Sequence, residues 1–171
     1  GVSGGAIVAA FIANGFKPSH IREIMLHDPL FRPFDSINNM MSNAWTGTMS
    51  ALMGRPPSMR TWVEDVVRTY KLEPKSNLRI AAAEVLKDGK HKEFIFAGDN
   101  LRTQDDLVLA LTASTAAVDM MIPAVRHVHN GKTIELVDGA YFNPIGDAGG
   151  DRPAIASHVG AGSNRSEERR V

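Results

Sequence analysis

A serine set among glycines, Gly1-Val2-Ser3-Gly4-Gly5, is the first feature of this sequence that can support chemistry. It fits the pattern G-x-S-x-G, in which a sharp turn raises a nucleophilic serine to the start of a helix. Small neighbours suit such a turn, because its backbone is strained and a substrate must approach closely. The start of a helix also favours negative charge that develops nearby. From these residues alone, an ordinary glycine-rich turn is an equally good interpretation.

A serine hydroxyl needs a base that accepts its proton, and histidine is the usual one. The chain has six histidines, none of them in a motif typical of a catalytic base: His20, His27, His91, His127, His129 and His158. Histidines that face solvent or bond locally are the simpler interpretation. A histidine-dependent α/β-hydrolase is an alternative, and it would require a histidine late in the chain, for which His158 is the candidate.

A carboxylate is the other candidate base. Asp138-Gly139-Ala140 follows the apolar run 134–137, so Asp138 stands at the end of a predicted strand, in a turn that glycine opens. That position suits a side chain that faces a site. An ordinary Asp-Gly turn explains the same residues, and on this feature alone it is the better explanation.

Hydrophobic periodicity predicts the elements that position these residues. Helices are expected at 1–15, with Asn14-Gly15 as the stop, at 19–27, at 36–53, from Ser58 to Tyr70, and at 105–118. Strands are expected at 78–86 and 93–97 around the turn 87–90, at 126–129 and 133–137 around Asn130-Gly131, and at 154–159. The alternation of helices and strands favours a layered α/β domain.

Composition excludes several classes of protein. The 171 residues fit one domain, and 43% apolar with 22% charged residues argues against disorder. The 19 basic and 19 acidic residues leave no net charge of the kind that nucleic-acid binding requires. The absence of cysteine excludes a disulfide scaffold, a thiol nucleophile and a thiolate metal site. The longest apolar run, Ala6–Ala13, is far shorter than the ~20 residues of a membrane span.

Together, the motifs resemble the patatin-like phospholipases. The order matches that family: Gly1–Gly5, the small-residue helix, Ala113-Ser114-Thr115-Ala116-Ala117 before Pro123, and Asp138-Gly139-Ala140 with Asn143-Pro144. The resemblance covers about residues 1–160, which would form the catalytic domain, with 161–171 as a charged flexible tail. It implies an α/β fold, a three-layer sandwich with a mainly parallel central sheet.

The resemblance also implies a function. Ser3 would be the nucleophile and Asp138 the general base of a Ser–Asp dyad, with Gly1, Val2, Gly4, Gly5, Gly139 and Ala140 completing the two motifs. The chain would hydrolyse lipid acyl esters, in the manner of a phospholipase or lysophospholipase, through an acyl-enzyme and without a metal or organic cofactor. Its partners would be a lipid or acyl ester substrate and a membrane surface, not nucleic acid. A cytoplasmic or membrane-peripheral location is expected.

The chain departs from the family pattern in two places. The family has a glycine-rich oxyanion loop with an arginine, and a strand, before the nucleophile. Since nothing precedes Gly1 here, we expect both to be missing and the oxyanion-hole donors to lie upstream. In addition, Val118-Asp119-Met120 stands where the family often has a proline. A truncated, catalytically inactive module that binds lipid or a partner chain is therefore the alternative interpretation.

A cluster of methionines has two interpretations. Met40, Met41, Met49, Met53 and Met59 gather around Trp45. Flexible side chains of this kind can accommodate varied acyl chains. An amphipathic helix that packs on the core explains the same spacing.

Overall fold

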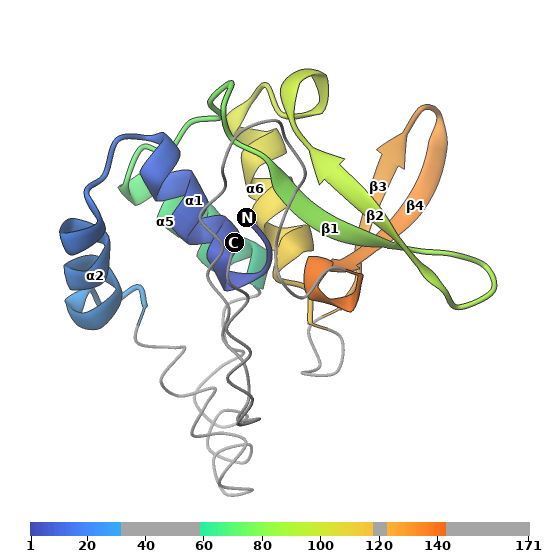
Figure 1. The fold of residues 1–171 in the computed structure, drawn as a ribbon, viewed down its shortest axis with the longest axis horizontal. Coiled ribbons are helices and arrows are strands. Elements are labelled where there is room, and N and C mark those ends of the chain that lie inside the picture. The colour runs from blue at the N-terminus through green and yellow to red at the C-terminus, as the bar shows by residue number, and fades with distance from the viewer. Residues whose placement is uncertain (32–58, 118–122, 143–171) are drawn as a thin grey trace, which may run out of the picture.

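The computed structural model of the protein describes residues 1–31, 59–117 and 123–142 (Figure 1). The elements are α1 (Gly4–Ala13), α2 (Pro18–His27), α5 (Met59–Thr69), β1 (Ile80–Val85), β2 (His91–Phe96), η1 (Gly98–Asn100), α6 (Gln104–Ser114), β3 (Val125–His129), β4 (Lys132–Asp138) and η3 (Gly139–Tyr141). Every helix and strand predicted from periodicity over these ranges is present, with ends that differ by a few residues.

The described strands form one four-stranded sheet in the order β2-β1-β4-β3. All three pairs are antiparallel, because each of the hairpins β1–β2 and β3–β4 reverses the chain and β4 then pairs antiparallel with β1. Asn130 and Gly131, the residues of the second hairpin turn, both have positive φ (49° and 73°). This geometry suits a two-residue hairpin and explains the Asn-Gly pair.

Helix α6 connects the sheet with the other helices. It lies between the sheet and α5 in Figure 1 and packs against β1, β4 and α5. A reciprocal cap fixes its start: Thr103 Oγ1 accepts the N–H of Asp106, and the Asp106 carboxylate accepts the N–H of Thr103. Leu107 and Leu111 are fully buried in the core. This packing fixes where the C-terminal end of α6 lies relative to β1.

Strand β1 is buried on both faces and carries a run of small side chains. Ala81, Ala82 and Ala83 are each no more than 1% exposed. Ala82 belongs to the main hydrophobic core, whereas Ala81 packs with Val2 and Ile95 in a second, small cluster. Small side chains let neighbouring segments approach the backbone of β1 closely. The segments that do so carry the candidate catalytic residues.

The predicted parallel sheet is not confirmed over the described residues, whose named strands all pair antiparallel. A parallel contact does occur outside those strands, as an isolated bridge between Val2 and Ala81. The predicted helix at 36–53, the strand at 154–159, the tail at 161–171 and most of the methionine cluster lie outside the described residues. The domain boundaries stay a prediction.

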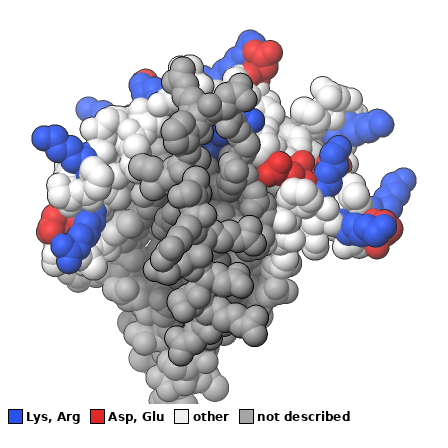
Figure 2. Space-filling view, viewed as in Figure 1, with Lys and Arg blue, Asp and Glu red and all other residues white. Residues whose placement is uncertain are grey.

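The described surface has a mixed charge pattern. On the face drawn in Figure 2, Lys and Arg side chains are interspersed with Asp and Glu, in keeping with the equal numbers of basic and acidic residues. In the part of the chain that the structure describes, no helix combines the length and apolar character that crossing a bilayer requires.

Candidate active site

Ser3 and Asp138, 135 positions apart in sequence, meet in a hydrogen bond. Ser3 Oγ donates to Asp138 Oδ2 at 2.6 Å. The contact arises at one edge of β1, where β4 ends with Asp138 opposite Ala82. The next residue of β1, Ala81, pairs with Val2 instead. Two distant segments thus occupy successive positions along the same edge, and this brings the nucleophile candidate to the base candidate.

Backbone hydrogen bonds hold the N-terminal segment on β1. The N–H of Ala81 donates to the carbonyl of Gly1 at 2.9 Å, and the Gly1 nitrogen donates to the carbonyl of Arg79 at 2.7 Å. A Cβ on Gly1 would lie 2.7 Å from Ala6 Cα and 2.7 Å from the carbonyl oxygen of Gly5. Glycine is therefore required here, because the first turn of α1 passes directly over this residue.

Ser3 has a strained backbone. Its φ of 52° and ψ of −138° lie in a region that residues with a side chain rarely adopt. It stands at the N-cap of α1, where a serine side chain normally accepts a hydrogen bond from the helix backbone. Here it makes no such cap and donates to Asp138 instead. The hydroxyl is thus directed toward the carboxylate at the expense of helix stability.

Both carboxylate oxygens of Asp138 have a donor. Oδ2 accepts from Ser3 Oγ, and Oδ1 accepts from the N–H of Ala140 at 2.8 Å. The residue is only 5% exposed. Burial raises the pKa of Asp138, and the two hydrogen bonds oppose this shift. A raised pKa makes the carboxylate a stronger base than an exposed aspartate.

Gly139 is required for a reason that differs from the sequence interpretation. It is not among the described glycines with positive φ, so it does not serve to open the turn. A Cβ at this position would lie 2.6 Å from the carbonyl oxygen of Ala81 and 3.3 Å from Val2 Cγ2. Glycine lets the turn after β4 pack directly on the backbone of β1, which places Asp138 beside the N-terminal segment.

The end of α6 supplies further hydrogen bonds to the site. Ser114 Oγ accepts the N–H of Ser3 at 2.9 Å and donates to the carbonyl of Ala81 at 2.6 Å. The carbonyl of Ala116 accepts the N–H of Asp138 at 3.0 Å. Sequence reasoning quoted these residues only as part of a motif and assigned them no role. The available signal for Ser114 was a pair of polar residues, Ser114 and Thr115, in an otherwise small, apolar run.

The described histidines make their contacts elsewhere. His20 packs on Phe16, His27 lies near Glu23, His91 stacks on Tyr141, and His127 and His129 pack against Phe94. Burial lowers the pKa of His127, in keeping with a neutral packed ring. Over the described ranges, no histidine forms a hydrogen bond with Ser3 or Asp138. His158 lies outside them.

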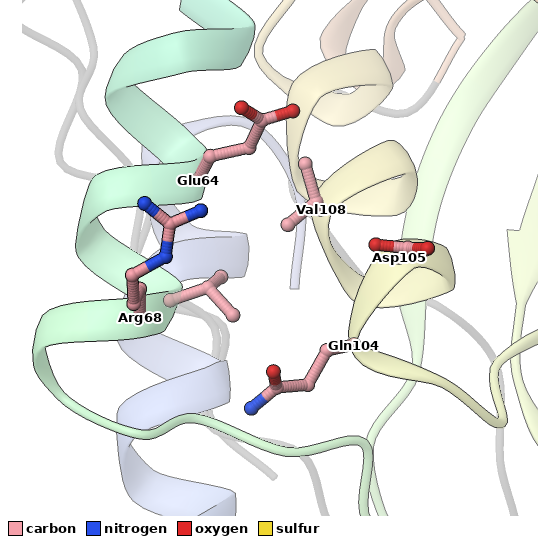
Figure 3. Close-up of a pocket in the computed structure, with 6 residues that line it drawn as sticks. Glu64, Arg68, Gln104, Asp105 and Val108 are labelled. Carbon is pink, nitrogen blue, oxygen red and sulfur yellow. The ribbon is translucent and has the colours of Figure 1, made fainter.

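A shallow hollow between α5 and α6 is separate from this site (Figure 3). Glu64 and Arg68 of α5 line it on one side, and Gln104, Asp105 and Val108 from the start of α6 line it on the other. Ser114 is at the other end of that helix, roughly 15 Å away at 1.5 Å per residue. Among the described residues, no cluster of three or more His, Asp or Glu side chains suits a metal ion.

A comparison with known protein families matches the part of the chain that contains the candidate site. A family model described as patatin-like phospholipase matches residues 1–148, which include both Ser3 and Asp138. No curated protein and no solved structure matches the chain.

The close approach at Gly139 predicts the effect of a single methyl group. Gly139→Ala forces its Cβ against a backbone oxygen that cannot rotate away, so we expect a loss of about 1–3 kcal/mol in the free energy of unfolding. Gly4→Ala is the control, because a Cβ there meets nothing within 4 Å. Denaturant unfolding of both variants measures the difference, and equal stabilities would contradict the steric argument.

The strained backbone at Ser3 predicts an unusual order of stabilities. Ser3→Gly and Ser3→Ala both remove the hydroxyl, but only glycine tolerates this φ, so we expect Ser3→Gly to be more stable by about 1 kcal/mol. At the helical residue Ser19 the order should be reversed, because glycine is a poor helix former. Thermal unfolding of the four variants tests this, and the same order at both positions would exclude strain at Ser3.

Proposed function

Because the chain belongs to the patatin-like phospholipase family, we propose that it is a lipid acyl hydrolase with Ser3 as nucleophile and Asp138 as general base. The observation that carries the proposal is the 2.6 Å hydrogen bond from Ser3 Oγ to Asp138 Oδ2. A base must lie within hydrogen-bond reach of the proton it abstracts, and this distance meets that requirement. The unused cap at Ser3 supports it too, because the hydroxyl is held in a strained turn with no benefit to the helix.

The first half of the reaction forms an acyl-enzyme. Ser3 Oγ attacks the acyl carbonyl carbon while Asp138 accepts the hydroxyl proton. The carbonyl π electrons move to oxygen and give a tetrahedral oxyanion. When the carbonyl re-forms, the bond to the leaving alcohol breaks, and Asp138 donates its proton to that alcohol. The acyl group is then an ester of Ser3.

The second half releases the fatty acid. Asp138, again a carboxylate, accepts a proton from a water molecule as the water oxygen attacks the acyl-enzyme. Ser3 Oγ leaves and takes the proton from Asp138, so the dyad returns to its starting state. The hydrogen bond from the N–H of Ala140 holds Asp138 in one orientation through both halves.

Charge on the oxyanion is stabilised at the start of α1. The first N–H groups of a helix lack intrahelical partners and carry partial positive charge. Gly4 and Gly5 begin α1 directly after the nucleophile, so their N–H groups are the candidate donors within this chain. Donors upstream of Gly1, which the family resemblance implies, remain an expectation.

The finer points of fold and substrate belong to the same proposal. The parallel bridge between Val2 and Ala81 supports a parallel strand before the nucleophile turn, as in a three-layer sandwich with a mainly parallel central sheet. Domain limits of 1–160 and 161–171 stay part of the proposal. Phospholipids or lysophospholipids are the proposed substrates, met at a membrane surface in a cytoplasmic or membrane-peripheral location, with no nucleic-acid partner and no cofactor.

Replacing the nucleophile should abolish both activity and labelling. The full chain should react covalently with a fluorophosphonate at Ser3 and hydrolyse a short-chain p-nitrophenyl ester, whereas Ser3→Ala should do neither, since no hydroxyl remains to attack. Ser19→Ala removes an exposed serine on α2 and should leave both unchanged. Mass spectrometry locates the label. Label on another serine in Ser3→Ala would refute the assignment, and lipid binding without any label would favour the inactive module.

Replacing the base should lower turnover by several orders of magnitude without loss of stability. Asp138→Asn keeps an oxygen for the N–H of Ala140 but cannot accept the proton, so we expect kcat to fall ~10²–10⁴-fold. Because burial raises the pKa of Asp138, the folded protein binds this proton more tightly than the unfolded chain does. Folding stability that comes from the neutral carboxyl is lost as pH rises through that raised pKa, so Asp138→Asn should be at least as stable at pH 7.

The pH profile of the wild-type chain provides the matching measurement. We expect kcat/KM to fall as pH decreases, with an apparent pKa above the ordinary 3.8 of aspartate, because a protonated Asp138 cannot act as base. Asp105→Asn, at an exposed position of α6, should leave this fall in kcat/KM at low pH unchanged. Replacing each of the six histidines singly should lower kcat/KM only slightly. A histidine as essential as Ser3 would require a triad in place of the dyad.

A further inference from the structure

Ser114 is a fully buried hydroxyl that joins three elements. It is the last residue of α6 and is 0% exposed. Its Oγ accepts the N–H of Ser3 at 2.9 Å, across 111 positions of sequence, and donates to the carbonyl of Ala81 at 2.6 Å. A buried hydroxyl is costly unless its hydrogen bonds are made, and here it has both a donor and an acceptor.

The hydroxyl stands between two backbone groups that bond directly to each other in a regular parallel ladder. In a regular parallel ladder, a residue donates its N–H to the carbonyl of the residue before its partner. Its own carbonyl accepts the N–H of the residue after its partner. Ala81 donates its N–H to the carbonyl of Gly1, so its carbonyl would accept the N–H of Ser3. Instead, Ser114 Oγ bridges these two groups. The chain therefore separates from β1 at Ser3, where φ turns positive.

We propose that Ser114 is a positioning residue, whose hydroxyl fixes the Val2–Ser3 peptide against β1 so that Ser3 Oγ meets Asp138. The proposal rests on the function proposed above. It is supported by the second contact near the end of α6, since the carbonyl of Ala116 accepts the N–H of Asp138. The backbone N–H groups of Ser3 and Asp138 are thus bonded to Ser114 and Ala116, which are only two residues apart.

Loss of this hydroxyl has a defined local consequence. Ser114→Ala leaves the partly buried N–H of Ser3 and the buried carbonyl of Ala81 without the hydroxyl that joins them. The strained backbone of Ser3 then has one tether fewer and can relax away from its positive φ. The Ser3 hydroxyl moves with it, so the proton transfer to Asp138 loses its geometry.

The neighbouring residue Thr115 provides a matched control. It is buried, and its hydroxyl donates to the carbonyl of Leu111 at 2.9 Å within its own helix. Thr115→Val removes this hydroxyl with almost no change of shape. Both substitutions therefore delete one buried hydroxyl from the same end of α6, but only Ser114→Ala removes a contact with the nucleophile turn.

The test compares the full-length wild-type chain, Ser114→Ala and Thr115→Val under conditions in which each is fully folded. We expect Ser114→Ala to reduce kcat and the rate of fluorophosphonate labelling at least tenfold with KM little changed. Thr115→Val should keep wild-type rates. A wild-type labelling rate in Ser114→Ala, or an equal loss in both variants, would overturn the proposal.

A second measurement does not depend on activity. Hydrogen exchange followed by NMR should show a protected Ser3 amide in the wild type and in Ser3→Ala, because the bond to Ser114 uses only the backbone of residue 3. Exchange should be at least tenfold faster in Ser114→Ala and unchanged in Thr115→Val. An unprotected Ser3 amide in the wild type would overturn the positioning role. Protection in a wild-type chain that takes no label would instead refute the proposed function alone.

Ser114→Cys covers the case in which the alanine variant does not fold. A thiol keeps a donor and an acceptor, but its hydrogen bonds are weaker. Labelling of Ser114→Cys should then be slower than that of Thr115→Val, with weaker protection of the Ser3 amide. Rates and protection equal to those of the control would overturn the proposal.

Discussion

The hydrogen bond between Ser3 and Asp138 depends on one edge of β1, where β4 ends and the N-terminal segment takes its place. Ala81 is the residue at which the exchange occurs. Its N–H bonds to Gly1, its carbonyl bonds to Ser114, and the glycine after Asp138 packs on that carbonyl. Because each of these contacts is to the backbone of Ala81, they need a small side chain on β1 and glycines at positions 1 and 139, and only the contact from α6 needs a functional group, the Ser114 hydroxyl.

The site is built at a cost to stability that the rest of the domain must offset. Ser3 holds a strained backbone and leaves its helix without a side-chain cap, while Asp138 is a buried carboxyl. Strain of this kind is of the order of 1–3 kcal/mol per residue. The capped α6 and the buried core between the helices and the sheet provide the opposing stabilisation. Sites arranged in this way trade stability for activity.

Local sequence patterns predicted most elements, because periodicity and turn chemistry act over a few neighbouring residues. The Asn130-Gly131 hairpin and α6 are examples. The pairing of the strands was not predictable in the same way, since antiparallel contact between β1 and β4 joins residues far apart in sequence. Ser3 and Asp138, the proposed dyad, could be named from motifs, whereas the bridging hydrogen bonds of Ser114 depend on the tertiary position of α6. The reason for Gly139 was likewise a contact with β1 and not its own φ.

The end of α6 also bears on how the proposed dyad would respond to heat. A rigid shift of this helix moves the Ser114 hydroxyl and the Ala116 carbonyl together, so the separation between nucleophile and base is buffered against whole-helix vibration. Fraying of the last turn is different, because it releases both anchors at once. Opening one helix turn costs less free energy than unfolding the whole domain, although Ala113, Ser114 and Ala116, each 0% exposed, make this end more stable than an exposed one. Thermal inactivation would then begin below the melting temperature of the domain and would be reversible on cooling, as the turn re-forms.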